Sequence, residues 1–396
     1  MPIVQNTNLV IDTFHTELLK AAGVELVHVL THFHSDHRVG LTKSFRGRII
    51  CSDITGELLS TTVGVNRHFI EVLELGSELT IHPPIELELP SFSITFVDAN
   101  HCPGSVSVVI KGSDFTYFYM GDSRITESGI AGIKRVHASQ FDIAWVDSTF
   151  FDNNALWDAM PSVPDSLAAL RKFMLNCSGG IALEFELLGT EILIESVLDQ
   201  FPDERVLVLS EQRYNELEVL YSKNTRMLSR LVPHPSGSEV DFRNRFLVIP
   251  RSMRTPSGYT RVRATTQRWA NRIRTNAAGE PLQIVEHDKT NHICFIFFSM
   301  HSCKREIDHL INELRVRETR ILFPPIQVFD RDESESKVEP ETSILKEKPR
   351  SVRCRRRPFE FSMDSMWLDA MVDSQETLMP SQGRNDDMTL PTWCLK

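Results

Sequence analysis

The 396-residue chain lacks any hydrophobic run that reaches the roughly 18 residues needed to cross a membrane, so we expect no membrane-spanning helix. Its first residues, MPIVQNTNLVIDTF, have no basic flank before an apolar core, and we therefore expect no secretory signal. The sequence also lacks a CxxC motif, because its 7 cysteines are scattered. An odd number at irregular spacing predicts free thiols in a reducing compartment and excludes a disulfide framework or a cysteine-rich zinc site.

No bias in composition sets the chain apart from ordinary globular proteins. Apolar residues make up 41% and charged residues 24%, which excludes a wholly disordered or fibrous protein. The length allows two or three domains, and we find no internal repeat. The 43 basic and 53 acidic residues give a net charge of −10, which by itself disfavours nucleic-acid binding. The distribution of that charge is more informative than its sum.

The pattern of short segments changes twice along the chain. Up to about residue 150, runs rich in β-branched and aromatic residues predict many short strands, at 9–11, 26–30, 48–51, 85–89, 93–97, 105–110 and 115–120, with a short helix at 54–61. From about 163, predicted helices (165–175, 191–201, 304–314) alternate with predicted strands (181–185, 205–209, 293–298, 320–323), which indicates βαβ units and a parallel sheet. Beyond about 330 the chain is charged and almost free of large apolar residues, which predicts a disordered tail.

The strongest chemical signal is the motif HFHSDH at 32–37, directly after the apolar run 27–30. His32 and His34 alternate along the chain, so an extended segment directs both side chains the same way. Asp36 and His37 lie on the turn that follows and can serve a second ion. Imidazoles and carboxylates are suitable ligands for Zn²⁺ and related ions. Four such side chains within six residues rarely have a purely structural role.

Three further segments place similar side chains at the ends of predicted strands. His101 lies in the tight turn DANHCPG (98–104), Asp122 follows the strand ending at 120, and Asp12 follows the strand 9–11. Each is weak evidence alone, because aspartate after a strand is usually a turn residue. Taken in order with the HFHSDH motif, they predict one shared metal centre, in which a carboxylate at the position of Asp122 can bridge two ions.

In this order the motifs resemble the ligand set of the metallo-β-lactamase superfamily. Within it, ANHCPGSV (99–106) and YMGDSR (119–124) resemble the DNA cross-link repair nucleases of the Snm/Pso group, the Apollo branch most closely, with Artemis-like features. The resemblance covers residues 1–328 and implies an α/β fold, a four-layered αβ/βα sandwich with an inserted β-CASP domain. The implied parts are 1–158 and 293–329 for the metallo-β-lactamase domain, 159–292 for the β-CASP insert and 330–396 for the disordered tail.

The resemblance also implies the role of each ligand. The first ion is Zn²⁺, with the ligands His32, His34, His101 and Asp122. The second ion is Zn²⁺, Mg²⁺ or Mn²⁺, with the ligands Asp36, His37 and Asp122. Two such ions activate water and take up charge from phosphoryl oxygens, which is hydrolytic chemistry.

Further residues are assigned by the same resemblance. Asp12 would orient ligands from outside the centre. His301, in FSMHS (298–302), would protonate the leaving group or stabilise the phosphorane, with Asp165, in PSVPD (161–165), setting its tautomer. Ile326, in LFPPI (322–326), takes the apolar option of the DNA-directed members, which favours DNA over RNA.

A basic stretch indicates where DNA could bind. Residues 242–279 contain nine arginines and no acidic residue. Arginine binds phosphate bidentately, and aromatic side chains stack on unpaired bases. The expected DNA-binding residues are Arg251, Arg254, Arg261, Arg263, Tyr259 and Trp269. The alternative is a solvated basic loop.

One segment departs from the family. The phosphate-pocket segment corresponds here to ELLGTE (186–191), in which Thr190 replaces the lysine that holds a terminal 5′-phosphate. Glu184 and Glu186 add negative charge that would repel such a phosphate. This favours a structure-specific endonuclease as an alternative to a 5′-exonuclease. Asp147, Ser148 and Ser302 remain as candidate parts of a phosphate pocket.

The sequence therefore predicts a metal-dependent DNA nuclease that acts in DNA repair, interstrand cross-link repair or telomere and end processing. We expect a nuclear monomer that binds DNA with single-stranded, free or damaged ends, and no membrane. The segment 359–371 would either bind repair or telomere proteins or be a partly helical tail without a partner. The basic cluster 352–358 would be a nuclear import signal, a nucleic-acid contact or an ordinary basic run in a tail. The alternatives are an RNA-processing β-CASP nuclease, a small-molecule hydrolase and a catalytically degenerate repair scaffold.

Overall fold

The computed structural model describes residues 3–14, 25–150, 160–185, 187–234, 244–269 and 283–322. Residues Met1–Val328 form one compact unit. Ile326 and the predicted tail lie outside the described residues. In the described ranges, no helix has the length and apolar composition needed to span a bilayer. The five described cysteines are free thiols, as the irregular spacing predicts, and four of them are buried.

Two sheets form what we call the first domain. The smaller has four parallel strands in the order β1 (Leu9–Ile11), β2 (Val27–Val29), β3 (Arg48–Cys51) and β4 (Ile70–Val72). Helix α2 (Asp53–Leu58) follows β3 and continues as a π-helical turn, Leu59–Val63, which confirms the expected short helix. The larger sheet has the order β17-β9-β8-β7-β6-β5, formed by β5 (Glu78–Ile81), β6 (Phe92–Asp98), β7 (Val106–Lys111), β8 (Thr116–Tyr119), β9 (Ile143–Val146) and β17 (Glu318–Ile321).

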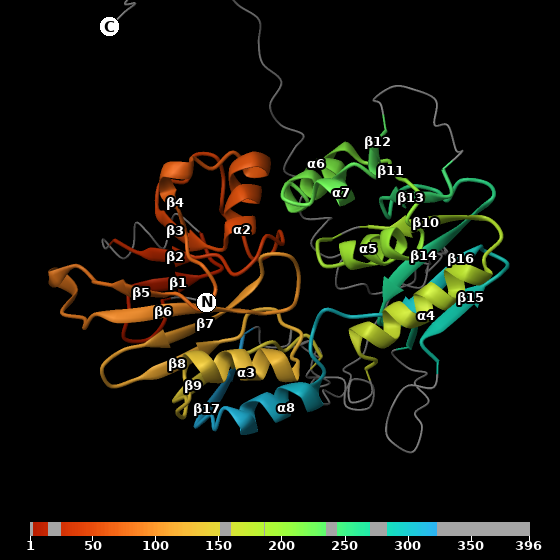
Figure 1. The fold of residues 1–396 in the computed structure, drawn as a ribbon. Helices are drawn as coiled ribbons and strands as arrows, with labels where there is room; N and C mark the ends of the chain where they lie inside the picture. Colours follow the sequence, from red (N-terminus) through yellow and green to blue (C-terminus); the bar gives the residue numbers. More distant parts are fainter. Residues whose placement is uncertain are drawn as a thin grey trace, which may run out of the picture. The chain divides into compact units, whose positions relative to one another are not determined.

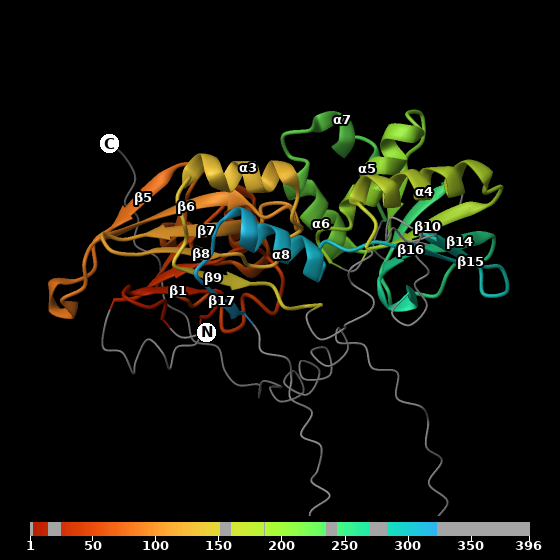
Figure 2. The same ribbon diagram turned by 90° about the horizontal axis from the view of Figure 1, so that it is seen from below.

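Side-chain alternation along the strands explains how these layers pack. In β8, Tyr117 and Tyr119 belong to the core shared with the four-stranded sheet, whereas Phe118 belongs to the core under α3 (Glu127–Val136) and α8 (Lys304–Glu313). Figures 1 and 2 show α3 and α8 side by side on one face of the six-stranded sheet. The four-stranded sheet covers the other face, with α2 beyond it (Figure 1). The order of layers is helix, sheet, sheet, helix, as in the predicted sandwich.

A third sheet forms what we call the second domain. Its order is β12-β11-β13-β10-β14-β16-β15, formed by β10 (Gly180–Glu184), β11 (Val206–Val208), β12 (Leu231–Pro233), β13 (Phe246–Ile249), β14 (Tyr259–Thr265), β15 (Val285–Asp288) and β16 (Ile293–Phe297). All neighbours are parallel except β15 and β16. The helices are α4 (Val163–Asn176), α5 (Glu191–Gln200), α6 (Glu211–Leu220) and α7 (Thr225–Leu228). This confirms the parallel sheet predicted from alternating helices and strands.

Two details differ from the sequence-based expectations. The predicted return to the first domain at residue 293 is too early, because β16 pairs with β14 in the second domain's sheet and the chain rejoins the first domain at α8. Periodicity identifies a buried strand but not its neighbours. The predicted strand at 85–89 is a 3₁₀ turn, Ile85–Leu87, in which Ile85 is 90% exposed. Two prolines precede it, and proline provides no N–H group for strand pairing.

The strands of all three sheets are arranged so that several carboxyl ends meet. In the six-stranded sheet, β6, β8 and β9 run in the same direction, because β7 is antiparallel to both β6 and β8. The residues that follow these strands contact residues that follow β2 and β16, and Asp12, which follows β1, contacts His37 after β2. The carboxyl ends of strands are a common location of functional sites in α/β proteins.

Candidate metal centre

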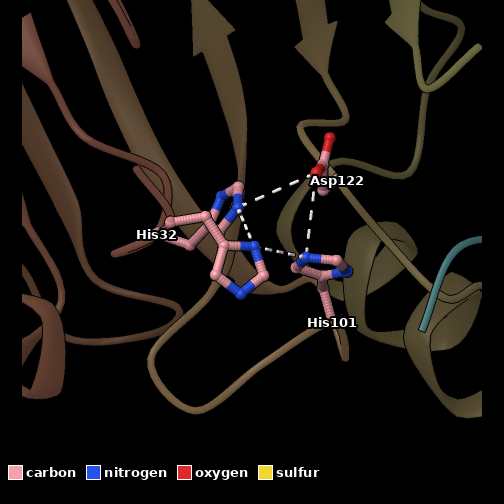
Figure 3. A group of neighbouring side chains, drawn as sticks. His32, His101 and Asp122 are labelled. Atoms are coloured by element: carbon pink, nitrogen blue, oxygen red, sulfur yellow. Dashed lines mark hydrogen bonds and ion pairs between the residues drawn. The ribbon is translucent and has the colours of Figure 1, made fainter. Parts of the chain in front are cut away.

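Four donor atoms converge at this meeting point, and Figure 3 shows three of the side chains directed toward one another. His32 Nε2 is 3.0 Å and His101 Nε2 is 3.2 Å from His34 Nδ1. Asp122 Oδ2 is 3.8 Å from His32 Nε2 and 3.7 Å from His101 Nε2. The structure thus brings together the four residues expected to hold the first ion, although they are spread over about 90 positions.

The spacing of these atoms suits a single ion. One ligand atom from each residue lies within 4.8 Å of the others. Four ligands about 2.1 Å from a tetrahedral zinc ion are about 3.4 Å from one another. The observed separations of 3.0–3.8 Å bracket that value. The cluster is therefore compatible with metal binding.

The outer nitrogens of two imidazoles are held by the second domain. His34 Nε2 is 2.9 Å from the Leu188 carbonyl oxygen, and His101 Nδ1 is 3.0 Å from the Met300 carbonyl oxygen. A carbonyl oxygen can only accept, so each of these nitrogens is the donor. The lone pair of each ring is then on the nitrogen that faces the cluster, as a metal ligand requires.

Asp12 orients two more imidazoles. Its carboxylate accepts hydrogen bonds from Thr31 N and Thr31 Oγ1, at 2.8 and 2.7 Å. Because Thr31 donates its only hydroxyl proton to Asp12, Oγ1 accepts from His32 Nδ1 at 3.0 Å. Asp12 Oδ2 also lies 2.9 Å from His37 Nδ1. Asp12 has a left-handed φ of 52°, a conformation that aspartate tolerates better than most residues.

Asp36 and His37 lie beside the four-residue cluster. His37 Nε2 is 3.3 Å from Asp122 Oδ2 and 3.6 Å from Asp36 Oδ2, so Asp122 faces both groups of expected ligands. The His37 side chain is 1% exposed, whereas that of Asp36 is 51% exposed. The Asp36 side of the centre is therefore open to solvent.

Neighbouring carboxylates divide the histidines of the centre into two electrostatic classes. Burial lowers the pKa of His32 well below its usual value, that of His34 to about 3 and that of His101 to about 4, so these rings are neutral at pH 7. Burial opposes the charged form of His37 too, but the Asp122 and Asp12 carboxylates hold its pKa well above the usual value. The neutral rings are the form that binds metal.

His301 forms a pair with Asp147 beside the cluster. His301 Nδ1 is 2.7 Å from Asp147 Oδ2, and its ring centroid is 4.6 Å from that of His101. Although burial opposes it, the carboxylates of Asp147 and Asp122 raise the pKa of His301 to about 9. Ligand atoms of Asp122, Asp147 and His301 also lie within 4.8 Å of one another.

The prediction that Asp165 sets the tautomer of His301 is wrong, because Asp147 takes that place. Asp165 is exposed in the first turn of α4, where its carboxylate accepts from Ser162 Oγ at 2.6 Å. Ser162 caps the helix, and the Ser-x-x-acid pattern has a local structural explanation. The signal for Asp147 was its position directly after a strand, which also identified Asp12 and Asp122.

Several predicted DNA contacts are structural residues. Tyr259 is 7% exposed and Trp269 is 5% exposed, and Trp269 stacks on Phe297 with ring centroids 4.9 Å apart. Both aromatics are core residues, so the predicted stacking on bases is wrong. The Ser302 hydroxyl donates to Ser123 O at 2.7 Å and accepts from Ile125 N at 2.8 Å, which leaves it unsuited to bind phosphate. Ser148 is partly exposed directly after Asp147.

The negative charge of Glu184, on which the predicted repulsion of phosphate rests, is paired with two arginines. Arg261 Nη1 lies 3.1 Å and Arg263 Nη2 lies 2.9 Å from Glu184 Oε2, so two cations surround one carboxylate. Arg261 is buried, and the Arg263 side chain is 27% exposed. Arg251 and Arg254 are exposed after β13. Glu186 and the arginines at 243, 272 and 274 lie outside the described residues.

A close approach of the two domains occurs at Gly189. It has φ of 104°, and a Cβ atom there would lie 2.9 Å from the His101 carbonyl oxygen. Thr190 Oγ1 donates to Leu187 O at 2.9 Å, and Gly189 N donates to the buried Glu191 carboxylate at 2.5 Å. These contacts fix the loop that presents the Leu188 carbonyl to His34. No sequence motif reveals this role, because backbone atoms provide it.

Comparison with known proteins agrees with this geometry. Residues 8–174 match the family described as "Beta-lactamase superfamily domain". The chain is 30% identical over 219 residues to the "5' exonuclease Apollo" of Mus musculus, which covers 55% of this chain and 39% of that protein. It is 34% identical over 129 residues to the "DNA cross-link repair protein SNM1" of Arabidopsis thaliana, covering 31% and 25% respectively.

A third relative is the "DNA cross-link repair 1A protein" of Homo sapiens, 25% identical over 203 residues, which are 48% of this chain and 18% of that protein. The chain therefore spans 39% or less of the length of these three relatives. The matches confirm the resemblance to the β-lactamase superfamily and to the Snm/Pso group that the motifs at 32–37, 99–106 and 119–124 indicate.

Proposed function

We propose that this chain, which carries a β-lactamase superfamily domain similar to that of the Snm/Pso repair proteins, is a metal-dependent nuclease that hydrolyses phosphodiester bonds in DNA. The observation that carries this proposal is the convergence of donor atoms from His32, His34, His101 and Asp122 within 4.8 Å. The names of the relatives support DNA as the substrate and cross-link repair as the process. A nuclear location is part of the same proposal.

The donor set supports Zn²⁺ at the first position, because three neutral imidazoles and one carboxylate are typical zinc ligands. Asp36, His37 and Asp122 would hold a second ion. When bound, such ions supply Lewis-acid activation of water and neutralise charge on phosphoryl oxygens. Asp12 keeps the rings of His32 and His37 in the orientation that this requires.

His301 is suited to be the proton donor of the reaction. With a pKa raised to about 9, its imidazolium is the main form at neutral pH. Asp147 accepts from Nδ1, so Nε2 is the nitrogen that can donate a proton to a leaving oxygen or a hydrogen bond to a phosphoryl oxygen. Asp147 therefore replaces Asp165 in this part of the proposal.

The polarity of cleavage depends on the surroundings of Thr190. The neutralised Glu184 removes one objection to a 5′-phosphate, and the mouse relative is named a 5′ exonuclease. We therefore propose 5′-exonuclease activity. A structure-specific endonuclease is the second candidate, because Thr190 offers a hydroxyl already bonded to Leu187 O and no positive charge.

Digestion of end-labelled DNA tests the proposal. We expect the zinc-loaded protein to shorten a 5′-phosphorylated single strand from its 5′ end and to stop when a chelator is added. A 5′-hydroxyl strand and a hairpin substrate distinguish the exonuclease from the endonuclease, and an RNA strand tests the RNA-processing alternative. An absence of metal-dependent cleavage of every DNA substrate would falsify the proposal and favour a degenerate scaffold.

A further inference from the structure

We propose that Arg38 binds a backbone phosphate of the substrate at the open, Asp36 side of the metal centre. This inference rests on the proposed nuclease function and assigns a specific contact to it. Arg38 directly follows His37, so the loop that positions the expected ligands also positions this arginine. A single basic residue after a motif is not by itself a sign of function, so the role of Arg38 becomes apparent only in the structure.

The guanidinium of Arg38 is held in a defined orientation. Its Cζ atom lies 4.8 Å from the centroid of the buried Phe33 ring, and Nε donates to the Phe33 carbonyl oxygen at 3.3 Å. Within the described residues, no hydrogen bond or ion pair engages Nη1 or Nη2. A fixed planar fork with these two nitrogens available is the geometry that binds phosphate bidentately.

The charges around Arg38 leave it without a full counterion. The groups that act on it are Glu216, Arg213 and Asp36. Glu216 is 3% exposed and already accepts from Arg213 Nη1 at 2.6 Å and from Gln212 Nε2 at 3.2 Å within α6. Two arginines therefore share one carboxylate. An ion bound by Asp36 would take up the remaining negative charge, and Arg38 would then favour an anion.

The location of Arg38 coincides with the opening of the centre. The side chains of His32, His37 and His101 are 3% exposed or less, that of Asp122 is 10% exposed and that of Asp36 is 51% exposed. Solvent therefore reaches the expected ligands at Asp36, which precedes Arg38 by two positions in the sequence. Arg38 also lies close enough to α6 of the second domain to interact electrostatically with Glu216 and Arg213. A phosphate there would lie between the metal loop and the second domain.

The test measures binding without turnover. Zinc-loaded full chain is titrated with a short phosphorothioate single strand, which resists hydrolysis, over a range of salt concentrations. We expect Arg38→Gln to weaken binding about 10-fold at low salt and to reduce the slope of log K against log[salt] by about 0.7, the value for one phosphate contact on a single strand. Arg38→Lys should keep the slope but lose about 3-fold in affinity, because lysine cannot bind bidentately.

Arg317→Gln is the matched control, because Arg317 is an exposed arginine directly before β17. This variant should bind the strand with an affinity within about 2-fold of wild type. An Arg38→Gln variant with unchanged affinity and slope overturns the inference, and so does one that loses its zinc, since Arg38 would then support the ligand loop. A second assay with unmodified DNA distinguishes the failure of this inference from the failure of the nuclease proposal. If the wild-type protein cleaves unmodified DNA and Arg38→Gln binds the phosphorothioate strand as tightly as wild type, only this inference fails. Wild type that leaves unmodified DNA intact contradicts the nuclease proposal itself.

Discussion

The two domains contribute to the candidate centre in different ways. The first domain provides the expected metal ligands as side chains, at His32, His34, Asp36, His37, His101 and Asp122. The second domain contributes two carbonyl oxygens, from Leu188 and Met300, and one histidine, His301. Side-chain ligands are recognisable in a sequence, whereas carbonyl contacts are not. The expected donors therefore lie in one domain, whereas the carbonyl groups that orient His34 and His101 lie in the other.

The largest expected effect is the loss of a first-domain donor. Asp122→Ala removes the carboxylate that faces both groups of ligands, so we expect loss of bound zinc and a decrease in DNA cleavage on the order of 10³-fold or more. Metal content and cleavage rate measure this. Asp114→Ala, an exposed aspartate in the β7–β8 turn, is the control. Full zinc content in Asp122→Ala would contradict the assignment of Asp122 as a metal ligand.

The next effect separates chemistry from metal binding. His301→Ala should keep zinc but reduce kcat about 10²–10⁴-fold, because it removes the proposed proton donor. A proton donor acts only when protonated, so wild-type activity should fall as the pH rises through the pKa of His301, about 9 in the absence of metal. Asp147→Asn removes the carboxylate that raises this pKa and should shift the alkaline limb to lower pH. An unchanged pH profile in both variants would exclude His301 as the donor.

A smaller effect tests the backbone contribution of the second domain. Gly189→Ala places a Cβ atom 2.9 Å from the His101 carbonyl oxygen and strains a residue with φ of 104°, so the loop that carries Leu188 O must move. We expect zinc affinity to fall about 10–100-fold, as when an outer partner of a ligand is lost. Gly258→Ala is the control, since Gly258 also has a positive φ but nothing within 4 Å of the added atom. Equal zinc affinities in the two variants would mean that this loop does not orient His34.

The smallest effect concerns stability. Burial raises the pKa of Glu191, at the start of α5, to about 7. A carboxyl group with a raised pKa in the folded state stabilises the protein at low pH, and this stabilisation is lost as the pH rises through about 7. The free energy of unfolding should fall by on the order of 1 kcal/mol per pH unit between the usual carboxyl pKa and about pH 7. Denaturation of Glu191→Gln should lack this dependence, and exposed Glu218→Gln should keep it.

Much of the first domain could be predicted from local patterns. The motif at 32–37 and the single residues after β1, β6 and β8 contain enough side-chain information to predict a shared site. The error at Asp165 arose because a helix cap and a catalytic acid have similar sequence contexts. The errors at Tyr259 and Trp269 arose because aromatic residues among arginines suit either a nucleic-acid surface or a core, and only tertiary packing distinguishes them. The position of β16 depended on strand neighbours, which periodicity does not reveal.

The carbonyl contacts of the second domain have a consequence for the order in which the protein matures. All the expected ligands have left the ribosome once residue 122 has emerged, but Leu188 and Met300 are made later. A nascent chain that ends before residue 188 has the donors without either carbonyl, and one that ends before residue 300 still lacks the carbonyl that fixes the tautomer of His101. Tight metal loading should therefore follow synthesis of most of the folded unit.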